Sequence, residues 1–173
     1  MFSFLSGREA APDPRLGIVL TEAIRAIAGQ QDNLDNLRSR VGILLSAATI
    51  ATSFLGGLVL DDGKVGWIGI AAVGLFVLHV LTALWILWPR QWTFHTGTKV
   101  MVNEWIEKDQ VDEDKMRWRL ARRLELYFDA NADRLESLWN GYALAIALLG
   151  LEIAGWLAEL GGFEGWLRTL QLG

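Results

Sequence analysis

The sequence contains no cysteine, only three prolines and only two histidines among its 173 residues. Without cysteine there is no disulfide framework, no thiol nucleophile and no cysteine-based metal site. The two histidines, His79 and His95, lie on opposite sides of Pro89 and make a poor metal site. The chain also lacks a phosphate-binding glycine loop, a paired-histidine metal motif and a Ser/His/Asp set on predicted loops. These absences predict a protein that is not an enzyme and that uses neither a metal nor a cofactor.

Charge is missing from three long segments, although charged residues make up 21% of the chain. Residues 41–60 carry none, residues 65–88 carry only His79 as an ionisable group, and residues 140–160 carry only two glutamates. As a helix rising ~1.5 Å per residue, each segment can cross ~30 Å of hydrocarbon. The sequence therefore predicts an all-α integral membrane protein with three transmembrane helices, forming one domain.

Lysine and arginine indicate how these spans are oriented. They number five in residues 1–40, one in residues 61–64, nine in residues 89–139 and one in residues 161–173. The positive-inside rule then places the N-terminus and residues 89–139 in the cytoplasm and the short C-terminal tail outside. The first span begins behind a long polar stretch, so we expect it to be retained rather than cleaved as a signal. We predict a multi-pass protein of a bacterial inner membrane.

Two cytoplasmic segments are expected to form long amphipathic helices. Asp13-Pro14 is a typical helix start, and the acids at 112–114 suit the beginning of a second helix. No proline separates either helix from the span that follows, so each can be continuous with its span. Both carry an apolar stripe, which calls for packing on each other or on a partner. On the second helix the candidate partner face comprises Met116, Leu120, Leu124, Phe128 and Leu135.

The basic stretch from Lys115 to Arg123 has neighbouring acids that nearly balance its charge. We interpret it as a solvated helix face or as a surface for anionic lipid head groups. Nucleic acid is not an expected partner.

Two intramembrane ionisable residues, His79 and Glu152, are the candidate site residues. Charged groups inside a bilayer are costly, usually face protein or water, and often mark ion or proton paths. The alternative is that a neutral histidine and a hydrogen-bonded glutamate merely fix helix packing. Glu159 lies near the predicted outer interface and needs no special role.

Small residues form a second candidate feature, on one face of the first span. They are spaced by three or four residues and comprise Gly42, Ser46, Thr49, Ser53 and Gly57. Such a face permits close approach of another helix, with hydroxyls bonding across, or it can line a narrow polar pore. The third span also has small faces, so the sequence favours a homo-oligomer.

Residues 31–50 carry a resemblance to a known family. A polar helix ending Gln31-Asp-Asn-Leu-Asp-Asn-Leu-Arg38-Ser-Arg40 runs directly into Val41-Gly-Ile-Leu-Leu-Ser-Ala-Ala-Thr-Ile, and a tight hairpin and a helical segment follow. This architecture resembles the SLATT family and the related transmembrane domain of Pycsar effectors over roughly residues 15–140. The chain departs from the two-span SLATT pattern by a third span, and it has no separate cyclic-nucleotide module.

The resemblance implies a small prokaryotic effector of nucleotide-signalled antiviral defence, which acts by membrane disruption. We therefore expect an oligomeric membrane-perturbing or channel-like effector controlled by its cytoplasmic helical layer. The controlling partner would be a protein or a nucleotide second messenger on the cytoplasmic side. The alternative is a non-catalytic membrane scaffold that recruits a protein through the helix of residues 111–138.

Overall fold

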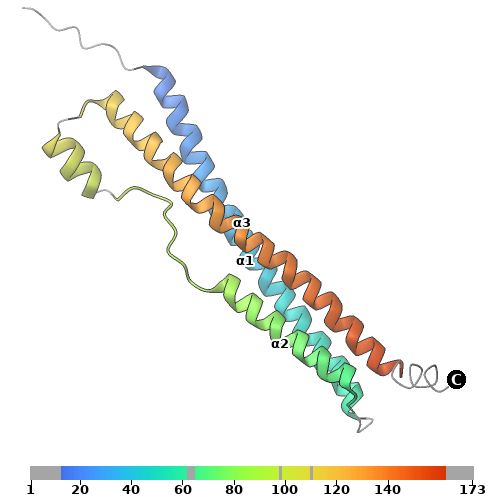
Figure 1. The fold of residues 1–173 in the computed structure, drawn as a ribbon. Helices are drawn as coiled ribbons and strands as arrows, with labels where there is room; N and C mark the ends of the chain where they lie inside the picture. Colours follow the sequence, from blue (N-terminus) through green and yellow to red (C-terminus); the bar gives the residue numbers. More distant parts are fainter. Residues whose placement is uncertain (1–12, 62–64, 98, 110, 163–173) are drawn as a thin grey trace, which may run out of the picture. The chain divides into compact units, whose positions relative to one another are not determined.

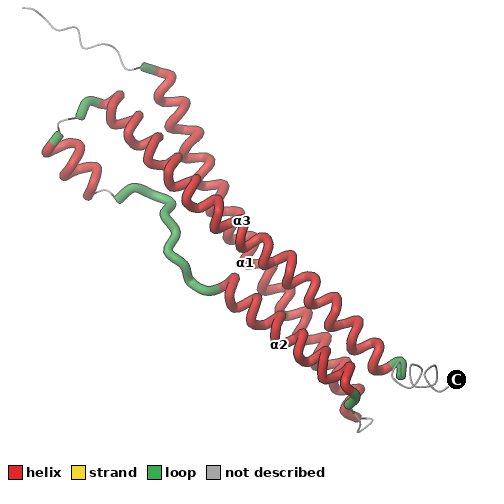
Figure 2. The backbone as a smooth tube through the Cα atoms, in the orientation of Figure 1, coloured by secondary structure: helices red, strands yellow, loops and turns green. Residues whose placement is uncertain are grey.

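The computed structural model describes residues 13–61, 65–97, 99–109 and 111–162. Within them the chain forms helices and loops and no strand (Figure 2). The helices are α1 (Pro14–Asp61), α2 (Trp67–Leu87), the π-helical η1 (Val100–Lys108) and α3 (Glu113–Leu160) (Figure 1). The predicted outer turn at residues 62–64 and most of the C-terminal tail lie outside the described residues.

Three of these helices, α1, α2 and α3, are long and apolar enough to cross a membrane. The all-α class and the three candidate spans are therefore confirmed. The ends of α1 at Asp61 and of α3 at Leu160 fall within one residue of the predicted span ends. The sequence left open whether the polar helices continue into the spans. Both α1 and α3 are unbroken helices of 48 residues.

Side-chain caps explain where the two long helices begin. Asp13 accepts a hydrogen bond on Oδ1 from the Arg15 backbone N–H at 3.0 Å, just ahead of Pro14. The Arg15 side chain also hydrogen-bonds this carboxylate, which holds the Asp13 pKa below its usual value. At the start of α3, Asp112 Oδ1 accepts from the Lys115 backbone N–H at 2.7 Å. Each cap satisfies one of the free N–H groups of a first helical turn.

By its internal contacts the chain divides into two units. The polar unit combines Met1–Asp32 with Trp92–Ala132, and the span unit combines Asn33–Gln91 with Asp133–Gly173. In the polar unit, Gln30 Nε2 donates to the Phe128 carbonyl at 2.9 Å. The Asp13 backbone N–H donates to Asp114 Oδ2 at 3.0 Å, so α1 and α3 pack on each other within this unit.

In the span unit, α1, α2 and α3 lie side by side (Figure 1). Their buried positions include small side chains that let the helices approach closely, namely Ala48 on α1, Ala72 and Ala83 on α2, and Ala145 on α3. Gly155 on α3 lies against Ala72 on α2, where a Cβ placed on Gly155 would be 3.2 Å from the Ala72 Cβ. Close approach through small residues is the usual way in which membrane helices pack.

Burial along both long helices follows a seven-residue repeat. On α1 the buried residues at this spacing are Ile27, Leu34, Val41 and Ala48. On α3 they are Leu124, Asn131, Leu138, Ala145 and Glu152. A repeat of this length keeps one seam of a helix against its neighbour, because two turns of an α-helix span about seven residues. Glu152 is thus buried by its position in the seam.

Candidate functional site

Two ionisable side chains lie in the interior of the span unit. His79 on α2 and Glu152 on α3 are both fully buried, with 0% of their surface exposed. The other buried residues of α2 are apolar, and those of α3 within the span unit are Leu138, Ala145, Leu148 and Trp156. The two candidates that the sequence analysis selected therefore face protein.

The Glu152 carboxylate is held by a side chain of a different helix. Thr52 Oγ1, on α1, donates a hydrogen bond to Glu152 Oε1. The second oxygen, Oε2, is buried and has no hydrogen-bond partner among the described residues. A buried carboxyl oxygen without a partner is costly, so Oε2 is the atom of this group that remains free to form a further hydrogen bond.

His79 has the matching arrangement on α2. Its Nδ1 lies 3.0 Å from the carbonyl oxygen of Ala145 on α3. Because a carbonyl can only accept, the hydrogen bond assigns the proton to Nδ1. In the neutral ring Nε2 is then an acceptor, and it too is buried without a partner among the described residues.

The two unpartnered atoms are chemically complementary. No hydrogen bond joins His79 to Glu152 in the described structure. The O–H of a protonated Glu152 is a donor and the His79 Nε2 lone pair is an acceptor, so the two groups have complementary hydrogen-bonding capacity. Thr52, His79 and Glu152 extend into the interior of the span unit from three different helices, and we call them the buried polar cluster.

The small-residue face of α1 does not contribute to this interior. Ser46, Thr49, Ser53 and Gly57 are exposed and Gly42 is half-buried in the single chain. The hydroxyls of Ser46 and Thr49 donate to carbonyls of their own helix, at 3.0 and 2.8 Å. A Cβ on Gly42 or Gly57 would meet no atom within 4 Å. This face is therefore open to lipid or to another protein chain.

Thr52 was missed by the sequence analysis, which selected the hydroxyl-bearing residues on either side of it. The signal that could have found it is the seven-residue repeat. Continuing the spacing of Leu34 and Val41 along α1 leads to Ala48 and Leu55, and Thr52 lies on the same side of the helix between them.

Glu159 has a structural role that the sequence analysis did not assign. Its Oε1 accepts from the Gly66 backbone N–H at 2.5 Å, and its Oε2 accepts from the Gly69 backbone N–H at 3.1 Å. These are free N–H groups at the start of α2, where the helix dipole also favours a negative charge. A side chain of α3 thus caps the neighbouring span.

The candidate partner face on α3 is partly occupied within the chain. Leu124 is buried, and Met116, Leu120 and Leu135 are half-buried, whereas Phe128 is exposed. Exposed large apolar side chains on this part of α3 are Trp118, Leu126 and Phe128. A partner would therefore meet a face shifted from the predicted one.

Comparison of the chain with protein-family models, curated proteins and solved structures found no significant match.

Proposed function

We propose that this protein is a homo-oligomeric, channel-like or membrane-perturbing effector of a bacterial inner membrane, controlled by its polar unit. The observation that carries the proposal is the buried polar cluster in an otherwise apolar set of candidate spans. Such groups are retained inside a bilayer mainly where ions or protons pass or bind. The resemblance to SLATT and Pycsar-type membrane effectors supports the same proposal. No catalytic reaction forms part of it.

The proposed orientation follows from the lysine and arginine distribution. Residues 1–40 and 89–139 lie in the cytoplasm, and the residue 61–64 turn and the C-terminus lie outside. The buried polar cluster then lies within the bilayer, and the polar unit is where a protein partner or a nucleotide second messenger would act. Since α1 and α3 each run unbroken out of the polar unit, both helices are suited to transmit that control.

The oligomer is proposed from surfaces that the single chain leaves open. The small-residue face of α1 is exposed, and so are Ala143, Ala147, Gly150 and Ala154 on α3. Helices associate in membranes through such small residues because van der Waals contact and interhelical hydrogen bonds drive the packing. Two open small-residue faces on different helices allow each copy to contact two neighbours.

Replacing Ser46 and Ser53 together by leucine is expected to dissociate the oligomer. The added side chains would hold a neighbouring helix away from the α1 backbone. The measurement is the mass of the purified protein in mild detergent. The control exchanges Ile50 and Phe54, exposed residues of the same helix, for leucine, which adds no bulk. If the Ser46→Leu, Ser53→Leu protein assembles like the wild type, this face meets lipid and the oligomer proposal loses its main support.

The channel-like activity is tested by ion flux from vesicles containing the purified protein. We expect flux that rises with protein density, measured with and without nucleotide ligands. Vesicles that stay ion-tight at high density under both conditions would contradict the proposal. They would favour the alternative, a scaffold that recruits a protein through the exposed Trp118, Leu126 and Phe128 of the 111–138 helix.

A further inference from the structure

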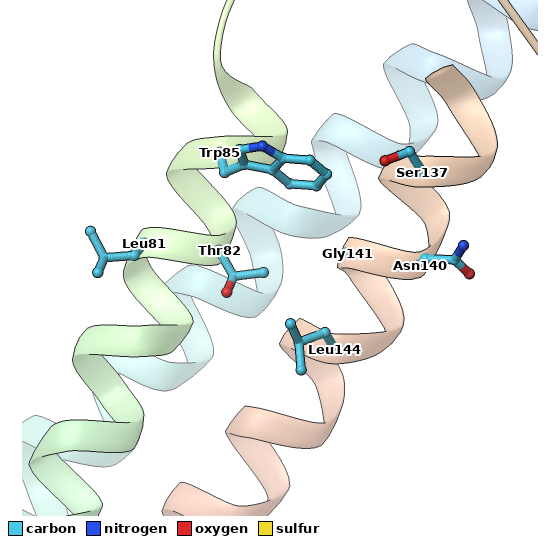
Figure 3. A pocket seen from close by; sticks show the side chains of 7 residues that line it. All are labelled: Leu81, Thr82, Trp85, Ser137, Asn140, Gly141 and Leu144. Carbon is cyan, nitrogen blue, oxygen red and sulfur yellow. The ribbon is translucent and has the colours of Figure 1, made fainter. Parts of the chain in front are cut away.

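A groove runs between α2 and α3 in the span unit, near the C-terminal end of α2 (Figure 3). Its volume is ≈ 500 Å³, and its lining consists of Leu81, Thr82, Trp85, Ser137, Asn140, Gly141 and Leu144. The walls are mainly apolar, and the Thr82 hydroxyl is already bonded to the Leu78 carbonyl at 2.8 Å. Because both walls belong to candidate spans, the groove has the position and character to take a lipid chain.

Trp85 closes one end of this groove against α3. Figure 3 shows its indole reaching from α2 toward Gly141 and Ser137. A Cβ on Gly141 would lie only 2.7 Å from the Trp85 ring, so the missing side chain is what lets the ring rest on α3. Tryptophan at the end of a span is typical of the level where lipid head groups begin.

Two arginines lie at this same end of the groove. The Arg90 guanidinium lies 4.5 Å from the centroid of the Trp85 ring, and it donates to the Trp85 carbonyl at 3.4 Å. Arg134 Nη1 donates to the Gln91 carbonyl at 2.7 Å. Arg134 lies about one helical turn before Ser137 on α3, and Gln91 directly follows Arg90, so this bond brings the segments of the two arginines together. Neither guanidinium forms an ion pair in the described parts of the chain, although Asp133 and Glu136 are close in sequence.

We propose that this groove binds one anionic phospholipid. Its acyl chain lies along Leu81 and Leu144, and its phosphate is bound by Arg90 and Arg134. Charge complementarity supports this occupant, because two cations without carboxylate partners in the described residues lie at the head-group end of an apolar groove. Guanidinium groups suit phosphate because their N–H donors match its oxygens in pairs, and Ser137 adds a hydroxyl beside them.

The test is native mass spectrometry of the detergent-purified protein with phosphatidylglycerol and with phosphatidylcholine of the same chain length. We expect preferential binding of phosphatidylglycerol. Replacing Arg90 and Arg134 by glutamine should weaken that binding by about fivefold for each arginine, the usual contribution of a basic residue at an anionic membrane surface. Binding of phosphatidylcholine should weaken less, because its choline group already offsets the charge of the phosphate. Leu144→Trp, which places a larger side chain in the groove, should weaken the binding of both lipids.

The matched control is Arg25→Gln, which removes an exposed arginine of the polar unit that pairs with Glu22 at 3.3 Å. It should leave lipid binding as in the wild type. Equal phosphatidylglycerol binding by the Arg90→Gln, Arg134→Gln protein would overturn the proposal, provided that its helix content matches the wild type. Displacement of the lipid by millimolar inorganic phosphate would overturn it too, because the site would then recognise phosphate without the chain. Dimers that bind neither lipid would overturn the proposal as well, because a second copy of the chain would then cover the groove. Lipid binding is measured independently of ion flux. The lipid site can therefore be confirmed even if the protein does not conduct ions.

Discussion

Replacing Glu152 by glutamine is expected to abolish proton flux through the reconstituted protein while leaving its fold and assembly intact. The amide oxygen of glutamine can still accept the hydrogen bond that Thr52 donates. The amide cannot take up or release a proton, so any proton transfer between this position and His79 Nε2 stops. The measurement is proton flux into vesicles, followed with an enclosed pH-sensitive dye at matched protein density.

Glu159→Gln is the matched control, because it makes the same substitution on the same helix outside the buried polar cluster. It should weaken the cap on α2 while retaining flux. If Glu152→Gln conducts like the wild type, the Glu152 carboxyl has a packing role only. In that case the proposed ion path does not pass through the buried polar cluster.

Trp156→Ala is expected to be strongly destabilising, by about 3–5 kcal/mol, the usual range for removing a large aromatic ring from a core. The ring is 3% exposed and packs with Val59 and Ala72. It also lies directly on Gly56, where a Cβ would be 3.3 Å from the ring. Its loss would leave a cavity where all three spans meet. The measurement is the free energy of unfolding in mixed detergent.

Trp88→Ala serves as the control for this substitution, because Trp88 is 68% exposed just after the end of α2. Its free energy of unfolding should stay within about 0.5 kcal/mol of the wild type. The Nε1–H of Trp156 is buried without a partner among the described residues, so Trp156→Phe should be milder than Trp156→Ala. Equal stability of Trp156→Ala and the wild type would show that the spans do not pack through this residue.

The parts of the structure that the sequence predicted are those that depend on composition and on neighbours along the chain. Spans follow from long runs without charge, and helix starts follow from Asp13 and Asp112, whose caps act over two or three residues. His79 and Glu152 were recognised because ionisable groups are scarce in such runs. These signals are local, so one sequence is enough to read them.

The remaining contacts depend on residues that lie far apart in the sequence. Thr52 and Glu152 are 100 positions apart, and Glu159 caps Gly66 from 93 positions away. Among the serines and threonines of α1, hydropathy does not distinguish the one that meets a carboxylate from those that bond their own helix. Only the rotation of α1 relative to α3 selects Thr52, and that rotation is a property of the packed helices.

The seven-residue repeat makes the buried polar cluster sensitive to the helical phase of α3. A single residue inserted after Tyr142 would rotate the rest of the helix by about 100° and carry Glu152 from the seam toward the lipid. An insertion of seven residues would restore the angle to within about 20° but displace the carboxyl by about 10 Å along the axis. In both cases the composition and length would still suit a membrane span. A register shift in α3 would therefore disconnect the carboxyl from Thr52 and His79 without any change in these three residues.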